Sequence, residues 1–574
     1  MLKKSKLLVS CILMIAMCAS MLIGCTVTKE TEGESKTSGT TAQSTSQGTE
    51  IKPYASDKVV ELTWLMRDDE QNPLNVNGTF FDDIEKLTGV RIKATPVIPD
   101  ALDERLNLAV ASKNLTDIVQ GDEADFFLRY GQDGAFIPLD DLIDKYAPNI
   151  KQHLNDPVYS EAKYWSRALD GKQYVVPTLR PEPDFSKHLM IRQDWLDKLN
   201  LKMPNNVEEF YAVLKEFKAN DLAGGGKTIP FSSMGSDMQQ FMILFDVDDD
   251  FFIENGEVKY GPADPRYKQA LEWLNKFYKE GLMHKEVFSL SEDQYYEDVY
   301  GGNVGVGYNS LGRLPKANKA LSQKFPDAGY KFTLLVPMES ITRQRRTNAE
   351  SVVEQPNAIS YSCKYPEVAI KLLDFFFTYD ATMLCSFGLP MKEGIKGAGA
   401  FEIVSDISQI PQEYIQAKEE FGNKDTIFIK AIVEDPVKQL LQYGYFERQT
   451  PHRGGSSFNR EVIDMSQPPP QNDERMVAIK TIRQTCPISF DLTKSSLGLA
   501  DFTFYKFTAD ESKRAGELLG PIESLVEEYK AKFIVGTEPL SNWDSVYMEK
   551  LKKLNIDELI KIYNDGYKRY IQMK

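Results

Sequence analysis

Four charged residues follow short apolar runs that have the pattern of β-strands, and their side chains could bind a polar ligand. Arg67 and Asp68 follow the first of these runs. Asp122 and Glu123 follow the third. Ligands of open α/β sheets bind beyond the carboxyl ends of the strands, where such residues lie. The sequence therefore predicts a ligand-binding edge that includes Arg67, Asp122 and Glu123.

No catalytic constellation accompanies these residues. The motifs Gly-x-Ser-x-Gly and His-Glu-x-x-His are absent, and the four histidines lie in unrelated contexts. A glycosidase needs only two carboxylates, which the 84 acidic residues could supply, so such an enzyme remains an alternative. We expect no cofactor.

The periodicity of apolar residues predicts the sheet that would position this edge. Runs at 59–66, 90–95 and 116–120 have the pattern of strands. Amphipathic runs at 79–87 and 102–112 separate them and predict helices. Strands that alternate with helices form a parallel sheet covered by those helices, so the fold class is α/β. A second series predicts strands at 188–192 and 303–308, helices at 207–217, 265–280 and 366–377, and a last helix at 556–570.

Composition limits the partners. The chain has 574 residues, enough for two to four domains, and a formal net charge of −16. Nucleic acid is disfavoured as a partner, because phosphate binding needs a basic face. The acidic run 246–250 could hold a cation, and the basic cluster 343–346 could grip an acidic sugar; for both, a solvated loop is the favoured interpretation.

The N-terminus predicts export and a lipid anchor. Lysines precede an apolar stretch that ends in Leu-Ile-Gly-Cys25, which resembles a bacterial lipobox. The resemblance implies a signal peptide at 1–24 and a lipid on Cys25. Residues 25–56 then form a linker, because twelve of the residues 26–49 are Ser or Thr. An uncleaved membrane anchor is the alternative.

Four segments resemble one family, the family-1 extracellular solute-binding lipoproteins of ABC importers, in the subgroup for complex sugars. The most specific begins Arg192-Gln193-Asp194-Trp195-Leu196 and continues to Pro204 and Phe210. The other three lie at 105–118, 134–143 and 532–544.

The resemblance implies a two-lobe fold of the periplasmic-binding-protein type (type II), with discontinuous lobes and a hinge. One lobe would hold 57–183 and 336–392. The other would hold 184–335 and 393–574. The cleft between lobes is the expected pocket.

Further candidate residues follow from this implied cleft. Relatives often carry a ligand-contacting aromatic residue where this chain has Tyr308, which Asn309 follows. Arg180 and Glu182 lie at the first expected crossing between lobes, and surface pairing of the two is the alternative. Trp64 and Trp165 could stack on a sugar or pack in the core.

One departure from the family concerns a calcium loop. Relatives often place oxygen ligands at alternate positions after the helix at 207–218. Here Ala223 and Gly225 occupy two of those positions and have no side-chain oxygen. We therefore expect no calcium at this loop.

The resemblance implies a lipid-anchored, monomeric receptor on the outer face of the bacterial cytoplasmic membrane. It would capture an oligosaccharide and deliver it to an ABC permease. A surface glycoside hydrolase or lyase, a receptor for a non-sugar solute, and a sensory partner of a membrane kinase are the alternatives.

Overall fold

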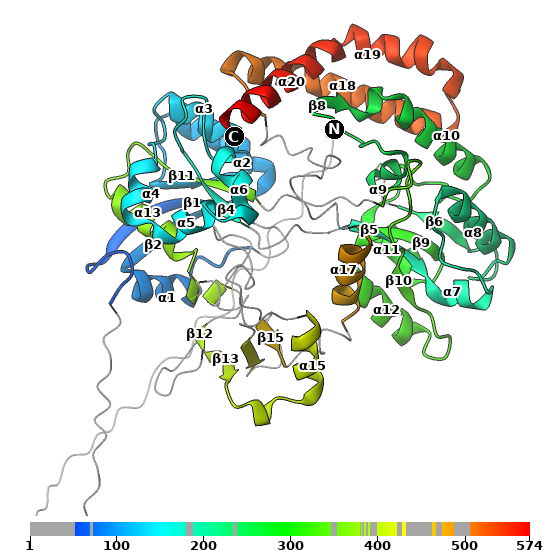
Figure 1. The fold of residues 1–574 in the computed structure, drawn as a ribbon, viewed down its shortest axis with the longest axis horizontal. Helices are drawn as coiled ribbons and strands as arrows, with labels where there is room; N and C mark the ends of the chain where they lie inside the picture. The colour runs from blue at the N-terminus through cyan, green and yellow to red at the C-terminus, as the bar shows by residue number, and fades with distance from the viewer. Residues whose placement is uncertain are drawn as a thin grey trace, which may run out of the picture. The chain divides into compact units, whose positions relative to one another are not determined.

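The structure is a computed structural model, drawn in Figure 1. The predicted signal peptide, Cys25, most of the predicted linker, Arg180 and Glu182 lie outside the residues that it describes. The described ranges are 52–68, 73–179, 187–233, 238–345, 353–378, 380–381, 384–385, 389–390, 399–421, 427–431, 462–465, 473–486 and 505–574.

The first sheet has five strands in the order β2-β1-β3-β11-β4. β1 (Val60–Arg67) pairs in parallel with β2 (Val90–Val97) and with β3 (Ile118–Gln120), as the alternating pattern predicted. β11 (Val353–Ile359) runs antiparallel to β3 and to β4 (Val176–Leu179). The sheet is therefore mixed, because a strand from a distant part of the chain enters it.

Helices cover this sheet and form one core with it. Their buried residues include Phe80, Leu106 and Phe127. The bounds of these helices are α1 (Thr79–Thr88), α2 (Pro99–Ala111), α3 (Ala124–Gln132), α4 (Asp140–Tyr146), α5 (Pro148–Leu154), α6 (Ser160–Trp165) and α13 (Pro366–Phe375).

A second sheet has four strands in the order β10-β5-β9-β6. β9 (Val304–Ser310) pairs in parallel with β6 (Ile229–Ser232) and antiparallel with β5 (Lys187–Arg192), which pairs with β10 (Phe332–Leu334). Gly305 lets two helices approach this sheet. A Cβ at that position would lie 2.6 Å from the ring of Phe217 and 2.8 Å from the ring of Trp195.

The second sheet has its own core, formed with other helices. Asn206 accepts a hydrogen bond from the N–H of Glu209 and begins α8, as the sequence predicted. The bounds are α7 (Gln193–Lys198), α8 (Val207–Ala219), α9 (Gln239–Met242), α10 (Pro265–Lys279), α11 (Glu292–Tyr300) and α12 (Arg313–Lys324), with a hairpin of β7 (Phe251–Glu254) and β8 (Glu257–Tyr260).

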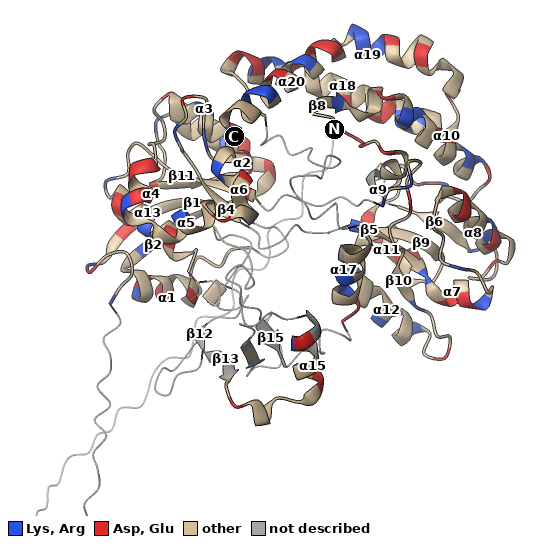
Figure 2. Ribbon diagram, in the orientation of Figure 1, with Lys and Arg blue, Asp and Glu red and all other residues tan. Residues whose placement is uncertain are grey.

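The C-terminal part is helical. α18 (Ala509–Val535) packs against α10, and α20 (Ile556–Met573), the predicted last helix, packs against β8 and α18. Acidic and basic residues are interspersed along these helices and α19 (Glu549–Lys553) (Figure 2). Within the described residues, no helix is both long enough and apolar enough to cross a membrane.

A third, small sheet has the order β12-β13-β14-β15. Phe428 packs with Ile410 and Tyr414 in a separate small cluster. The bounds are β12 (Leu389–Pro390), β13 (Gly399–Val404), β14 (Ile427–Ala431) and β15 (Val462–Asp464), with α15 (Gln412–Phe421) nearby in sequence and α17 (Glu474–Thr485) after them.

The acidic run 246–250 does not form the solvated loop that we expected. Asp248 is fully buried and Asp246 is 4% exposed. Asp249 lies 2.9 Å from the Nζ of Lys530 on α18 and accepts a hydrogen bond from the Tyr267 hydroxyl. The prediction of a solvated loop was wrong, because a buried cation from a distant helix pairs with this run.

Candidate ligand-binding site

Polar side chains gather where β1 and β3 end and β11 begins. We call this group the Gln120 edge and define it as Arg67, Gln120, Asp122, Gln355 and Asn357. The Nε of Arg67 lies 2.6 Å from Oδ1 of Asp122, so two of the predicted residues meet as an ion pair. The buried Gln120 accepts a hydrogen bond from the backbone N–H of Arg67 through its Oε1, at 2.9 Å.

Besides the Nε of Arg67, which meets Asp122 as an ion pair, three buried polar atoms of the Gln120 edge have no hydrogen-bond partner among the described residues. They are Nε2 of Gln120, Oε1 of Gln355 and Oδ1 of Asn357. Gln120 and Asn357 are direct neighbours across β3 and β11. A buried polar atom without a partner costs about 1–3 kcal/mol, so these atoms are candidates for bonds to a ligand.

The second sheet has a comparable group at the carboxyl ends of β6 and β9. We call it the Asn309 edge and define it as His188, Ser232, Tyr308 and Asn309. Asn309 is 4% exposed, and its Oδ1 accepts a hydrogen bond from the Tyr296 hydroxyl at 3.2 Å. Among the described residues, Nδ2 of Asn309 and Oγ of Ser232 have no hydrogen-bond partner.

His188 lies beside Asn309 across β5 and β9. It is 2% exposed, and burial lowers the pKa of its imidazole to about 3. The ring is therefore neutral at physiological pH. The Asn309 edge thus presents hydroxyl, amide and neutral imidazole groups.

The aromatic candidates are buried. Tyr308 is 5% exposed, and its backbone oxygen accepts a hydrogen bond from the Tyr295 hydroxyl. Trp64 has no exposed surface and packs edge-on against Phe376, at 5.8 Å between ring centroids. This packing favours the core interpretation for Trp64, and the ligand-binding role of Tyr308 stays a prediction.

Trp165 ends α6 and is 1% exposed. Its backbone oxygen accepts a hydrogen bond from Nζ of Lys506, at 3.0 Å. Lys506 is itself 3% exposed, and burial lowers the pKa of its ammonium to about 7. Trp165 therefore anchors the segment that leads into α18, whether or not it also contacts a ligand.

Two further charged residues flank the Gln120 edge. Asp68 accepts a hydrogen bond from the backbone N–H of Leu74 through its Oδ1, at 2.7 Å. Glu123 is exposed and occupies the N-cap position of α3. Neither lies among the buried groups, and their roles in binding stay predictions.

The loop where relatives often hold calcium is closed by its own hydrogen bonds. Oδ2 of Asp221 accepts a bond from the N–H of Gly226 at 2.7 Å, and Oδ1 accepts one from the Thr228 hydroxyl at 2.9 Å. These bonds hold the pKa of Asp221 below its usual value. The aspartate thus uses its oxygens within the loop.

Replacing Asp221 with alanine should lower the free energy of unfolding, because the loop N–H and hydroxyl groups lose their acceptor. Asp221→Asn keeps an acceptor oxygen and should lose less. Urea unfolding of the three proteins measures this. Neither calcium nor a chelator should change the urea concentration at which half of the wild-type protein is unfolded. A rise of this midpoint with calcium would contradict the account of this loop.

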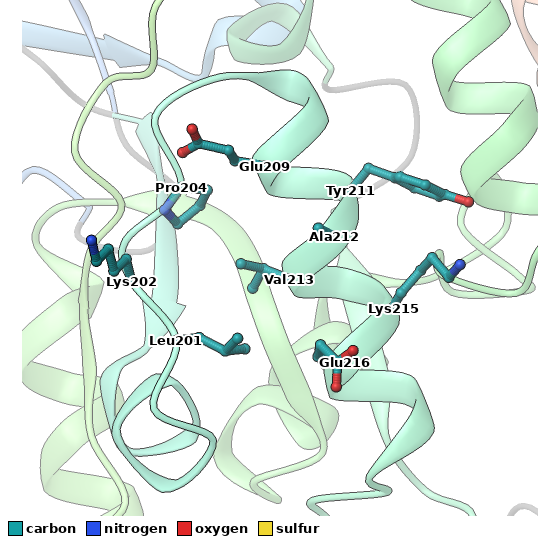
Figure 3. Close-up of a pocket in the computed structure, with 9 residues that line it drawn as sticks. All are labelled: Leu201, Lys202, Pro204, Glu209, Tyr211, Ala212, Val213, Lys215 and Glu216. Atoms are coloured by element: carbon teal, nitrogen blue, oxygen red, sulfur yellow. The ribbon is translucent and has the colours of Figure 1, made fainter.

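A hollow of about 580 Å³ lies elsewhere, between the segment 201–204 and α8 (Figure 3). Leu201 and Val213 point into the space between these two segments, and Tyr211 and Lys215 lie on the far side of the helix. None of the lining residues belongs to either polar edge. The hollow is therefore separate from the candidate site.

Most of the buried polar groups could not be recognised in the sequence. Gln120, Ser232, Gln355 and Asn357 were not singled out, because uncharged side chains inside apolar runs resemble ordinary strand residues. One signal was available. Gln120 ends a predicted strand, at the position where α/β sheets bind ligands.

The sequence and the fold are similar to those of known proteins. The sequence model of bacterial extracellular solute-binding proteins matches residues 76–383, more than half of the chain. The chain belongs to this family, which confirms the resemblance seen in the sequence. The names of the family and of its relatives describe the binding of solutes.

Two curated relatives match part of the chain. The fructooligosaccharide ABC transporter substrate-binding protein FusA of Streptococcus pneumoniae is 32% identical over 242 residues, 39% of this chain and 44% of FusA. The polygalacturonan/rhamnogalacturonan-binding protein YtcQ of Bacillus subtilis is 29% identical over 259 residues, 44% of this chain and 50% of YtcQ. The chain thus matches about half the length of each relative.

A solved structure confirms the α/β fold of the periplasmic-binding-protein type. The extracellular solute-binding protein from Bifidobacterium longum subsp. infantis superposes with a TM-score of 0.70 at 17% identity. The match covers 89% of this chain and 98% of that one.

Proposed function

We propose that this chain is a non-enzymatic, lipid-anchored receptor that captures an oligosaccharide and delivers it to an ABC permease. The observation that carries the proposal is the set of buried polar atoms at the two polar edges that have no hydrogen-bond partner within the described part of the chain. Sugar hydroxyls both donate and accept hydrogen bonds, so they can satisfy atoms of both kinds. The sugar-binding relatives FusA and YtcQ support the same function.

We also propose the lobe boundaries that the sequence analysis expected: 57–183 with 336–392, and 184–335 with 393–574. Two separate buried cores support them. The first draws on residues 55–179 and 353–385, and the second on 189–338 and 505–563. The cores differ from the proposed boundaries at 336–338, because Met338 packs in the second core. Such lobes could close on a ligand about a hinge, which would stabilise the state that a permease recognises.

A glycoside hydrolase or lyase is the main alternative. Among the residues that define the Gln120 edge, Asp122 carries a carboxylate, and this carboxylate is paired with Arg67. A glycosidase needs a second carboxylate at a fixed separation to act as acid or nucleophile. Asp68 and Glu123 flank this edge, so recovery of the glycan intact is the observation that separates binding from turnover.

Thermal unfolding of residues 51–574 against a panel of plant and microbial oligosaccharides tests the proposed function. Ligand that binds only the native state raises the midpoint as its concentration exceeds the Kd. We expect one glycan class to raise the midpoint and to be recovered intact. Turnover of the glycan would favour the enzyme, and no shift with any glycan would favour a non-sugar solute.

Asn309→Ala should weaken glycan binding about tenfold or more, because a ligand hydroxyl loses a buried hydrogen bond worth about 1.5 kcal/mol. Asn303→Ala is the matched control at the other end of β9, where Nδ2 of Asn303 donates to Asp298. Calorimetric titration of the three proteins measures the affinities. Equal affinities in wild type and Asn309→Ala would remove Asn309 from the site.

Cys25→Ala should move the protein from the membrane fraction to the medium, because stable anchoring needs the acyl chains on this residue. Labelled palmitate should no longer be incorporated. Cys18→Ala, inside the predicted signal peptide, is the control and should keep both label and membrane location. Label that persists in Cys25→Ala would show that the lipid lies elsewhere.

A further inference from the structure

Two neighbouring tyrosines of α11 reach the end of β9. The hydroxyl of Tyr295 donates a hydrogen bond to the backbone oxygen of Tyr308 at 2.9 Å. The hydroxyl of Tyr296 donates to Oδ1 of Asn309 at 3.2 Å. Gly307 makes room for the first contact, because a Cβ at that position would lie 2.7 Å from the Tyr295 hydroxyl. These bonds therefore hold the helix against the strand at two residues of the Asn309 edge.

Contacts with two other side chains hold the Tyr296 ring. The ring of Tyr300, one turn further along α11, stacks on it with 5.4 Å between the centroids and 15° between the ring planes. The guanidinium of Arg313 on α12 lies over it, 4.7 Å from the ring centroid. Burial raises the pKa of the Tyr296 phenol, so the hydroxyl stays protonated and can donate at physiological pH. The hydroxyl that bonds Asn309 therefore belongs to a ring with little freedom to move.

The amide of Asn309 is held in one orientation. Its Oδ1 accepts a hydrogen bond from the backbone N–H of Ser310 at 2.8 Å, as well as the bond from Tyr296. A backbone N–H can only donate, so the amide atom that faces it must be the oxygen. Nδ2 is then the second atom of the amide, and it has no hydrogen-bond partner among the described residues. The Asn309 edge thus offers a ligand a donor rather than an acceptor at this position.

The Gln120 edge shows the same use of a side-chain amide. Oε1 of Gln120 accepts from the backbone N–H of Arg67 at 2.9 Å, so the oxygen of this amide is also fixed by a group that can only donate. The amide atom that remains is the donor Nε2. Each sheet therefore offers an amide N–H to a ligand, and on the second sheet the hydroxyl of Tyr296 adds a further bond to the amide oxygen.

We propose that Tyr296 is a positioning residue of the ligand-binding site, whose hydroxyl holds the Asn309 amide so that Nδ2 donates to an oxygen of the bound glycan. Tyr296 acts through Asn309 and not by its own contact with the glycan. An amide that is already held loses less conformational freedom when ligand binds, so the bond from Tyr296 strengthens binding. This inference rests on the proposed function and adds the group that orients one of its contacts.

A double-mutant cycle in residues 51–574, measured by calorimetric titration, tests this inference. The probe is the member of the oligosaccharide panel that raises the unfolding midpoint most, and the panel begins with fructooligosaccharides and oligogalacturonides. Tyr296→Phe removes the hydroxyl and keeps the ring, so affinity should fall about three- to tenfold. Asn309→Ala should lower it about tenfold or more. The double variant should match Asn309→Ala within about twofold, because no amide is left for the tyrosine to hold.

Tyr211→Phe is the matched control. The hydroxyl of Tyr211 donates to Oε2 of Glu280 at 2.7 Å, and neither residue belongs to a polar edge, so this variant should bind the glycan as the wild type does. Unfolding midpoints without glycan show that each variant is folded. A tyrosine that only supported the fold would weaken binding equally with and without Asn309, so the cycle separates positioning from a structural role.

Two results would overturn the inference and leave the sugar receptor standing. One is an unchanged affinity in Tyr296→Phe. The other is a double variant whose affinity falls by the product of the two single effects, because Tyr296 would then act independently of Asn309. If no glycan of the panel binds the wild type, the proposed function itself fails, and the inference fails with it. The two kinds of failure are therefore distinguishable.

Discussion

Replacing Lys530 with methionine is expected to lower the free energy of unfolding by about 3–5 kcal/mol, because the change leaves the largely buried carboxylate of Asp249 without its cation. The Lys530 side chain is 2% exposed. Its Nζ lies 2.9 Å from Oδ2 of Asp249 and 2.7 Å from Oε1 of Glu527. The pair joins α18 to the start of β7, so its loss should loosen the C-terminal helices.

Lys532→Met is the matched control. Lys532 lies on the same helix, pairs with Glu528 and is 41% exposed. An exposed pair of this kind contributes at most about 1 kcal/mol. Urea unfolding of the three proteins measures the difference, and an equal effect of both substitutions would contradict the account of a buried ion cluster.

The same cluster predicts a pH dependence that Asp250→Asn should remove. Burial, with Asp248 and Glu523 nearby, raises the pKa of Asp250 to about 7. A raised pKa means that the native state binds the proton more tightly than the unfolded chain. The resulting stability is full below about pH 4 and is lost as pH rises to about 7, a total of about 4 kcal/mol.

Asparagine stays uncharged at every pH and can still accept the hydrogen bond from the N–H of Phe251. The variant should therefore lose less stability between pH 4 and 7 than the wild type and be the more stable protein above pH 7. Urea midpoints across this range, with exposed Asp144→Asn as the control, make the measurement. Parallel profiles for wild type and Asp250→Asn would contradict a buried, protonated Asp250.

The local elements of the fold could be predicted from the sequence, because each reflects a pattern within a few residues. Alternation at 59–66 and 90–95 predicted β1 and β2, and the spacing of apolar residues at 556–570 predicted α20. The entry of β11 between β3 and β4 could not be predicted. It depends on pairing between strands that are more than two hundred residues apart, such as Asn357 with Gln120.

The candidate site could be predicted in location but not in detail. The rule for the carboxyl ends of strands indicated Arg67 and Asp122, which the structure joins as an ion pair. The amides of Gln355 and Asn357 arrive on β11 and were therefore invisible to local patterns. The acidic run was misread for the same reason, since its partner Lys530 is 281 residues from Asp249.

A crystal structure of residues 51–574 with the glycan that raises the unfolding midpoint tests the central claim most directly. We predict sugar hydroxyls within hydrogen-bonding distance of Nδ2 of Asn309 on the second sheet and of Nε2 of Gln120 on the first. Neither atom has a hydrogen-bond partner among the described residues. A glycan bound elsewhere, with neither amide in contact with it, would contradict the account.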